Sequence, residues 1–214
     1  MKKLLIATSI AIVSINFLKA QEKGDVELGG NFGVNFSNLE LGRNDFNYSE
    51  SRIIHTIGFN IAFTGEYYFS DRWGIKTKLI YDQKGWGNGF IDNYDTGERF
   101  ITDFELNYCT IPVLANWHFD PNRNWYLNFG LYVGFLIDVN LKDISNKNEL
   151  MEIFETTGIG LAFGIGYKFQ VSENIHLFFE FDGQSGFNSI YKENNGENIT
   201  NNRSSFNFGV LFSL

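Results

Sequence analysis

The chain of 214 residues has little cysteine, little proline and no excess of positive charge. A single cysteine, Cys109, excludes a disulfide framework and a cysteine-based zinc site, and the three histidines are too widely spaced to suggest a metal site. With 17 basic against 25 acidic residues, the net charge of −8 argues against a nucleic-acid partner, which would need a basic surface. These shortages exclude a disulfide framework and a cysteine-based zinc site, and they argue against a nucleic-acid partner.

Phenylalanine and glycine, in contrast, are abundant, at 23 and 22 residues. So many aromatic side chains have to be buried somewhere, which argues against a disordered chain. The length is sufficient for one domain with a sizeable core, or for two small ones.

The first 20 residues have the pattern of a secretory signal peptide. Two lysines precede an uncharged apolar stretch over residues 4–18, and Ala20 provides a small residue at the cleavage site. The apolar stretch is shorter than the roughly 20 residues that a membrane helix needs. We therefore predict that residues 1–20 are removed and that residues 21–214 form a domain outside the cytoplasm.

Beyond residue 20 the dominant pattern is a period-two alternation of large apolar residues with polar residues and glycine, which is typical of β-strands. Pro112 lies inside the fourth run and cannot donate a hydrogen bond to a strand ladder, so a bulge or a register change is expected there. Eight such runs begin near these residues: Val26, Ile57, Trp73, Phe104, Trp125, Ile159, Ile175 and Phe206.

The connections between these runs alternate in length. Short polar turns are centred near residues 71, 122 and 172. The other connections are long and polar: Ser37–Arg52, Gly85–Asp103, Asn140–Glu155 and Ser185–Asn202. Short turns at one end and long loops at the other are typical of outer-membrane barrels, in which the short turns face the periplasm. The sequence therefore predicts an all-β fold, an eight-stranded antiparallel up-and-down transmembrane β-barrel.

The two faces of the predicted strands distinguish a membrane barrel from a soluble one. One face is nearly all apolar, whereas the other mixes glycine with charged residues. A narrow eight-stranded barrel has no room inside for so many large apolar side chains, so we expect that face to contact lipid; a soluble lipocalin-type barrel is the alternative. Aromatic residues beside the short turns are expected to form an interfacial girdle: Tyr67, Phe69, Trp73, Trp117, Phe119, Trp125, Tyr167 and Phe169.

Several segments resemble a known family of proteins. They are the run Asp71–Tyr81 with Gln83-Lys84-Gly85, the segment Leu106-Asn107-Tyr108 with Ile111-Pro112, and the glycine-rich runs Gly130–Gly134 and Gly158–Gly166. They resemble the outer-membrane β-barrel family common in Bacteroidota, often called porin-family or PorT-like. The resemblance implies a barrel in the bacterial outer membrane, in contact with lipid, and it implies no established substrate.

The last eight residues, Asn207–Leu214, resemble the C-terminal strand signal that the outer-membrane assembly machinery recognises. That machinery is therefore an expected partner, besides lipid. The alternating glycines of Gly158–Gly166 lack the strand–turn–helix context of a dinucleotide site, and we expect them to leave space in the lumen for Tyr126, Tyr132 or Phe178. No cofactor and no metal site are predicted.

The charged residues of the polar face are the candidate functional residues: Glu27, Glu66, Lys76, Lys78, Asp82, Lys168, Glu180 and Asp182. Buried charges need partners, so we expect these acids and bases to pair inside the barrel. A salt-bridged plug is the favoured interpretation, because eight strands leave little bore, and a charged path for ions or small solutes is the alternative.

The sequence contains no spacing that fixes a nucleophile against a base, so an enzyme is not expected. It predicts instead a structural or surface-interaction protein with a plugged lumen and a surface partner that the residues do not identify. A small-solute porin and a PorT-like accessory protein in protein secretion are the alternatives.

Overall fold

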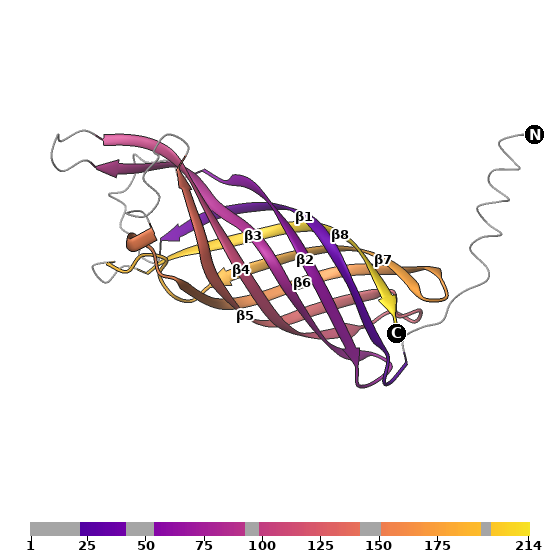
Figure 1. Cartoon of the computed structure of the whole chain (residues 1–214). Coiled ribbons are helices and arrows are strands. Elements are labelled where there is room, and N and C mark those ends of the chain that lie inside the picture. The colour runs from indigo at the N-terminus through magenta and orange to yellow at the C-terminus, as the bar shows by residue number, and fades with distance from the viewer. Residues whose placement is uncertain (1–21, 42–53, 93–98, 142–150, 194–197) are drawn as a thin grey trace, which may run out of the picture.

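The computed structural model describes residues 22–41, 54–92, 99–141, 151–193 and 198–214. They form these strands: β1 (Val26–Leu41), β2 (Thr56–Tyr68), β3 (Trp73–Asp92), β4 (Arg99–His118), β5 (Trp125–Leu141), β6 (Thr157–Ser172), β7 (Ile175–Gly186) and β8 (Ile199–Ser213). Each strand pairs antiparallel with the next, and β8 pairs with β1, so the sheet closes into an up-and-down barrel (Figure 1). The predicted fold class is confirmed. The proposed signal peptide, residues 1–20, lies outside the described residues.

The alternation in the sequence determines which side chains face outward. On β6, Leu161, Phe163 and Ile165 are exposed, whereas the residues between them face the lumen. Exposure of large apolar side chains recurs on the other strands and reaches 72% for Ile57. In water such a surface would be very unfavourable, but in lipid it is the expected exterior of a barrel.

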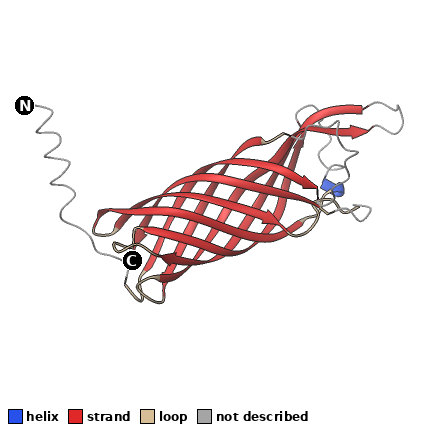
Figure 2. Ribbon diagram, turned by 180° about the vertical axis from the view of Figure 1, so that it is seen from behind, coloured by secondary structure: helices blue, strands red, loops and turns tan. Residues whose placement is uncertain are grey.

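The two ends of the barrel differ. Short turns join β2 to β3, β4 to β5 and β6 to β7 at the end where the C-terminus lies, and β3 and β4 extend beyond the other strands at the opposite end (Figure 1). A single helical turn, residues 151–153, also lies at that opposite end (Figure 2). Within the described residues, no helix has the length and apolar character needed to cross a membrane.

The long loop expected over Gly85–Asp103 is wrong in extent, because β3 continues to Asp92 and β4 begins at Arg99.

The expected bulge at Pro112 is also wrong. The pairing of β4 with β3 is interrupted at Ile111 and Pro112 and then resumes in the same register. A proline removes a donor without adding a residue, so the ladder loses hydrogen bonds there while its register is kept. Register shifts occur instead at Trp86/Gly89, Asn107/Tyr108 and Gln170/Ser172.

The aromatic residues beside the short turns form contacts along the outside of the wall. The rings of Trp73 and Trp117 stack with centroids 5.8 Å apart, and Trp117 contacts Phe119 at 5.7 Å. Trp125 and Tyr167 meet at 5.1 Å. This arrangement is that of an interfacial girdle, in which amphipathic rings lie at the level of the lipid headgroups.

A second apolar region lies inside the far end of the barrel, and we call it the apolar cap. The Trp86 and Phe104 rings stack there at 4.6 Å, and Phe154 stacks on Tyr191 at 5.1 Å. Burial raises the pKa of the Tyr191 hydroxyl above its ordinary value, so the group is neutral. The buried members of the apolar cap are Trp86, Phe104, Leu106, Tyr108, Leu136, Val139, Leu141, Phe154 and Ile190.

Candidate functional site in the barrel lumen

The structure places all eight candidate residues on the inner face of the barrel. Three of them, Lys76, Lys78 and Asp82, share the inward face of β3 because they are separated by even numbers of residues. Glu180 and Asp182 share the inward face of β7 for the same reason. The remaining three, Glu27, Glu66 and Lys168, come from β1, β2 and β6.

Ion pairs connect these residues, beginning near the short turns. Lys168 Nζ lies 2.5 Å from Glu27 Oε2 and 2.6 Å from Glu66 Oε2. The other Glu66 oxygen, Oε1, lies 3.1 Å from Lys76 Nζ. Lys76 Nζ in turn lies 2.6 Å from Glu180 Oε2. These four contacts join five side chains in one unbroken line.

The line continues toward the apolar cap. Lys78 pairs with the second Glu180 oxygen and lies 3.4 Å from Asp182 Oδ2. Arg203 then bridges two carboxylates, with Nη1 at 2.6 Å from Asp182 Oδ1 and Nε at 3.1 Å from Asp82 Oδ1. The last contact joins Asp82 Oδ2 to Lys84 Nζ at 3.6 Å.

Acids and bases alternate strictly along this line, which we call the ion-pair array. Its members in order are Glu27, Lys168, Glu66, Lys76, Glu180, Lys78, Asp182, Arg203, Asp82 and Lys84. The array therefore has no net charge. Each interior member has an opposite charge on both sides, which is the arrangement that offsets the large desolvation cost of buried ions.

Several of these pairs cross the bore from one wall to the opposite wall. In a closed ring of eight strands, β3 and β7 lie opposite each other, as do β2 and β6. Lys76 and Lys78 on β3 reach Glu180 on β7, and Lys168 on β6 reaches Glu66 on β2. The charged groups therefore lie across the middle of the lumen and do not merely line it.

Neutral groups fill the space around the ion-pair array and hydrogen-bond to it. The Tyr68 hydroxyl donates to Glu66 Oε2 at 2.5 Å and accepts from Lys168 Nζ at 2.8 Å. From the other side of the bore, Asn128 Nδ2 donates to Glu180 Oε2 at 2.7 Å. A cavity lined by Lys78, Asn128 and Glu180 measures about 10 Å³. That is about the space that one water molecule requires.

Glycines make room for the aromatic side chains of the lumen. The Tyr126 ring packs over Gly166 and the Tyr132 ring over Gly160, as the glycine pattern of β6 predicted. Phe178 packs over Gly209 of β8 instead. An added side chain at these glycines would collide with a ring.

Sequence reasoning missed Arg203 and Lys84, and also His176, whose Nδ1 lies 2.8 Å from Glu27 Oε1. Lys84 has the inward parity of Lys76 and Asp82 but lies at the edge of the loop that the sequence predicts over Gly85–Asp103. Arg203 has the parity of Asn207 but precedes the predicted start of the last strand. Following the parity two residues beyond Asp82 and four residues before Asn207 is the signal that would have found both.

A closed barrel with a lipid-compatible exterior, an aromatic girdle and a charged interior defines the class of outer-membrane barrels. The chain belongs to the outer membrane protein beta-barrel domain family, whose model matches residues 19–192. The protein is accordingly located in the bacterial outer membrane, in contact with lipid. No curated protein sequence matches the chain significantly.

Solved structures share the fold at low sequence identity. OprG from Pseudomonas aeruginosa is 14% identical, with 91% of this chain and 98% of that chain covered and a TM-score of 0.53. The outer membrane protein AlkL, solved in DMPC lipid bilayers, is 11% identical, with 90% and 91% covered and a TM-score of 0.51. At such identities the likeness concerns the fold alone.

Proposed function

We propose that this protein is a non-conducting outer-membrane barrel with a structural or surface-interaction role, and that it is not an enzyme. The ion-pair array acts as a plug, and the connections at the end of the apolar cap are the surface available to a partner. The observation that supports this proposal is the set of ion pairs that join opposite walls, Lys76 and Lys78 to Glu180 and Lys168 to Glu66.

The energetics of buried ion pairs favour a plug over a conducting path. Removing one partner of a buried pair costs about 3–5 kcal/mol, because the other charge is left without compensation in a poorly solvated site. A solute passing through the lumen would have to separate several pairs, and Lys76, Glu66 and Glu180 are fully buried. Conduction normally needs sites that bind weakly enough to release the ion.

The short turns provide a weaker argument against the secretion role. The connection between β2 and β3 spans residues 69–72, and that between β4 and β5 spans residues 119–124. We propose that these turns face the periplasm, as is general for this class. Turns of this size offer little surface to a partner in a secretion machine. We also propose that the chain is related to the PorT-like proteins of Bacteroidota, without sharing a role in secretion.

Single-channel recording in planar bilayers tests the plug against the small-solute porin. The wild-type protein should show conductance near the baseline. The double variant Lys76→Ala with Lys78→Ala should keep conductance near baseline, because tyrosines and asparagines still fill the bore, while its unfolding temperature in detergent falls. A matched control removes two exposed lysines, Lys23→Ala with Lys192→Ala, and should leave both quantities unchanged.

The porin hypothesis predicts the opposite pair of results. Stability would hardly change in Lys76→Ala with Lys78→Ala, and ion selectivity would shift toward cations because two positive charges have left the path. Measurable wild-type conductance with a selectivity change in the double variant would overturn the plug.

A further inference from the structure

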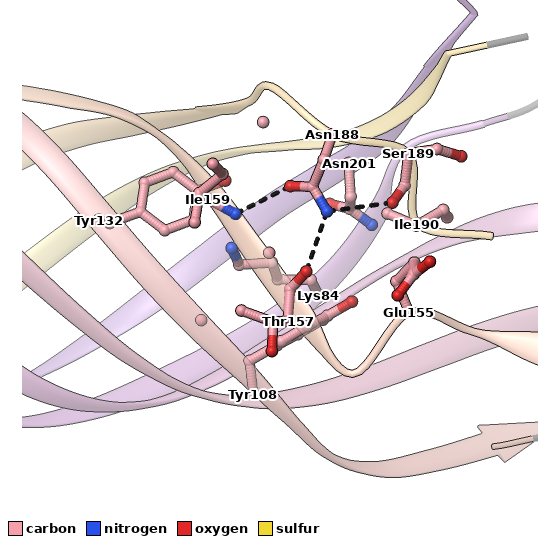
Figure 3. Close-up of a pocket in the computed structure, with 13 residues that line it drawn as sticks. Lys84, Tyr108, Tyr132, Glu155, Thr157, Ile159, Asn188, Ser189, Ile190 and Asn201 are labelled. Carbon is pink, nitrogen blue, oxygen red and sulfur yellow. Dashed lines mark hydrogen bonds between the residues drawn. The ribbon is translucent and has the colours of Figure 1, made fainter. Parts of the chain in front are cut away.

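A cavity lies on the inner side of the barrel, beside the place where β7 separates from β6 (Figure 3). The β6–β7 pairing ends at Gly160 and Gly186, and the side chain of Asn188 takes over the exposed edge of β6. Asn188 Oδ1 accepts from the Ile159 amide at 2.9 Å, and Nδ2 donates to the Thr157 carbonyl at 2.9 Å. The Phe187 amide still donates to the Ile159 carbonyl at 2.8 Å, so the carboxamide of Asn188 continues the pairing with β6 beyond that point and lines the cavity.

Glycines create the space behind Asn188. A Cβ atom added to Gly158 would meet nothing within 4 Å, and at Gly134 and Gly186 the nearest atoms would be 3.4 and 3.5 Å away. These positions differ from Gly160 and Gly166, which are filled by tyrosine rings. The cavity measures about 20 Å³, which suits a body the size of a water molecule or a small ion.

A buried polar side chain lines this cavity without a partner. Asn201 is 5% exposed, and both its amide nitrogen and its amide oxygen lack hydrogen-bond partners among the described residues. Leaving a buried polar group unpaired costs about 1–3 kcal/mol, so native proteins rarely keep one that nothing contacts. The Asn201 carboxamide lines the same cavity as Lys84, Tyr108 and Tyr132.

Lys84 is the least neutralised cation of the ion-pair array. Lys168, Lys76, Lys78 and Arg203 each contact two carboxylates. Within the described part of the chain, Lys84 contacts one, Asp82, at the longest distance in the array, 3.6 Å. Its hydrogen-bond and ring contacts are with neutral groups: Gln184 Oε1 accepts from its Nζ at 2.7 Å, and the rings of Tyr132 and Tyr108 lie 4.8 and 5.3 Å from it.

We infer that this cavity is a binding site for a small monovalent anion, with the Lys84 ammonium group and the Asn201 carboxamide as its ligands. A chloride ion or the carboxylate of formate has the charge and size that the site requires. The anion occupies the place that a second carboxylate takes beside every other cation of the array. Glu155 lines the side of the cavity away from the Lys84 nitrogen, and its charge disfavours larger, multiply charged anions (Figure 3).

The test is a titration of the full barrel in lipid nanodiscs, followed by the NMR signals of the Asn201 side-chain amide. Sodium chloride and sodium formate are added separately, and sodium sulfate keeps the ionic strength constant. Both monovalent anions should produce a saturable shift that sulfate alone does not produce. A response to chloride but not to formate would restrict the site to halides. The absence of a saturable response to either anion would overturn the inference.

Two variants separate specific binding from a general salt effect. Lys84→Met should weaken the apparent affinity about tenfold or more, because it removes a charge-assisted contact. Asn201→Asp places a carboxylate in the site itself, so its thermal unfolding should lose the anion dependence that the wild type shows. The control Lys192→Met removes an exposed lysine at the same end and should titrate like the wild type. A titration unchanged in Lys84→Met would also overturn the inference, whatever the conductance of the barrel.

Discussion

The interior of the barrel is stabilised in two different ways. From the short turns to Asp82 it contains charges that pair across the bore, whereas beyond Lys84 it contains stacked aromatic and aliphatic side chains. The charged part is surrounded by strands whose outer face is apolar, and the bore there is narrow and lined by polar residues. The apolar cap is formed by side chains of β3, β4 and β5 inside the far end of the barrel, together with Phe154 and Ile190, and it packs as the core of a soluble protein does. Where the exterior of the barrel is apolar, the interior is filled by paired charges. At the far end, the interior is filled by the apolar cap, which serves as a core of its own.

The largest effect is expected from the charged part. Glu180→Ala leaves Lys76 and Lys78 without their shared carboxylate and should reduce the free energy of unfolding by about 3–5 kcal/mol. The measurement is urea unfolding of the barrel in detergent. Asp71→Ala is the control: Asp71 lies 3.9 Å from Arg123 in an exposed pair, whose removal should cost about 0–1 kcal/mol. If both variants lose equally little, the lumen is solvated and the array is not a plug.

The apolar cap should respond more locally. Trp86→Ala removes the ring that stacks on Phe104 and should cost about 3 kcal/mol. Because the cap lies beyond the charged part, amide exchange over residues 86–92 and 99–106 should accelerate while the barrel still resists SDS without heating. Phe187→Ala, an exposed ring at the same end, is the control. Loss of SDS resistance in Trp86→Ala would show that the two regions unfold together.

The smallest effect separates two glycines of one strand. Gly166→Ala brings a Cβ atom against the buried Tyr126 ring and should destabilise by about 1–3 kcal/mol. Gly158→Ala meets open space and should change stability by less than about 0.5 kcal/mol. Thermal unfolding of the two variants side by side measures the difference. If both variants lost equally little stability, the Tyr126 ring would have to move aside. The lumen around Tyr126 would then be less tightly packed than its ion pairs indicate.

Much of this arrangement could be predicted from the sequence, because a barrel wall has a strict period of two. The strand count, the apolar exterior and the inward set from Glu27 to Asp182 all follow from that period. The extension of β3 to Asp92 could not be predicted, since its three glycines and Asn88 resemble a loop. That segment is held in a strand by contacts with distant residues, among them Phe104 and Phe154. Which acid pairs with which base across the bore could not be predicted either, because parity gives the face of a residue but not its position along the barrel axis.

Ion pairs along two diameters also have a mechanical consequence. The backbone hydrogen bonds of a barrel run around its wall and none of them runs across the bore, so by themselves they do not oppose flattening. Here β2 is tied to β6 and β3 to β7 by contacts of 2.6 Å, so the cross-section resists compression along both directions. The cross-section of the barrel then stays constant when the lateral pressure of the membrane changes. The apolar cap at the far end is therefore attached to a rigid part of the barrel.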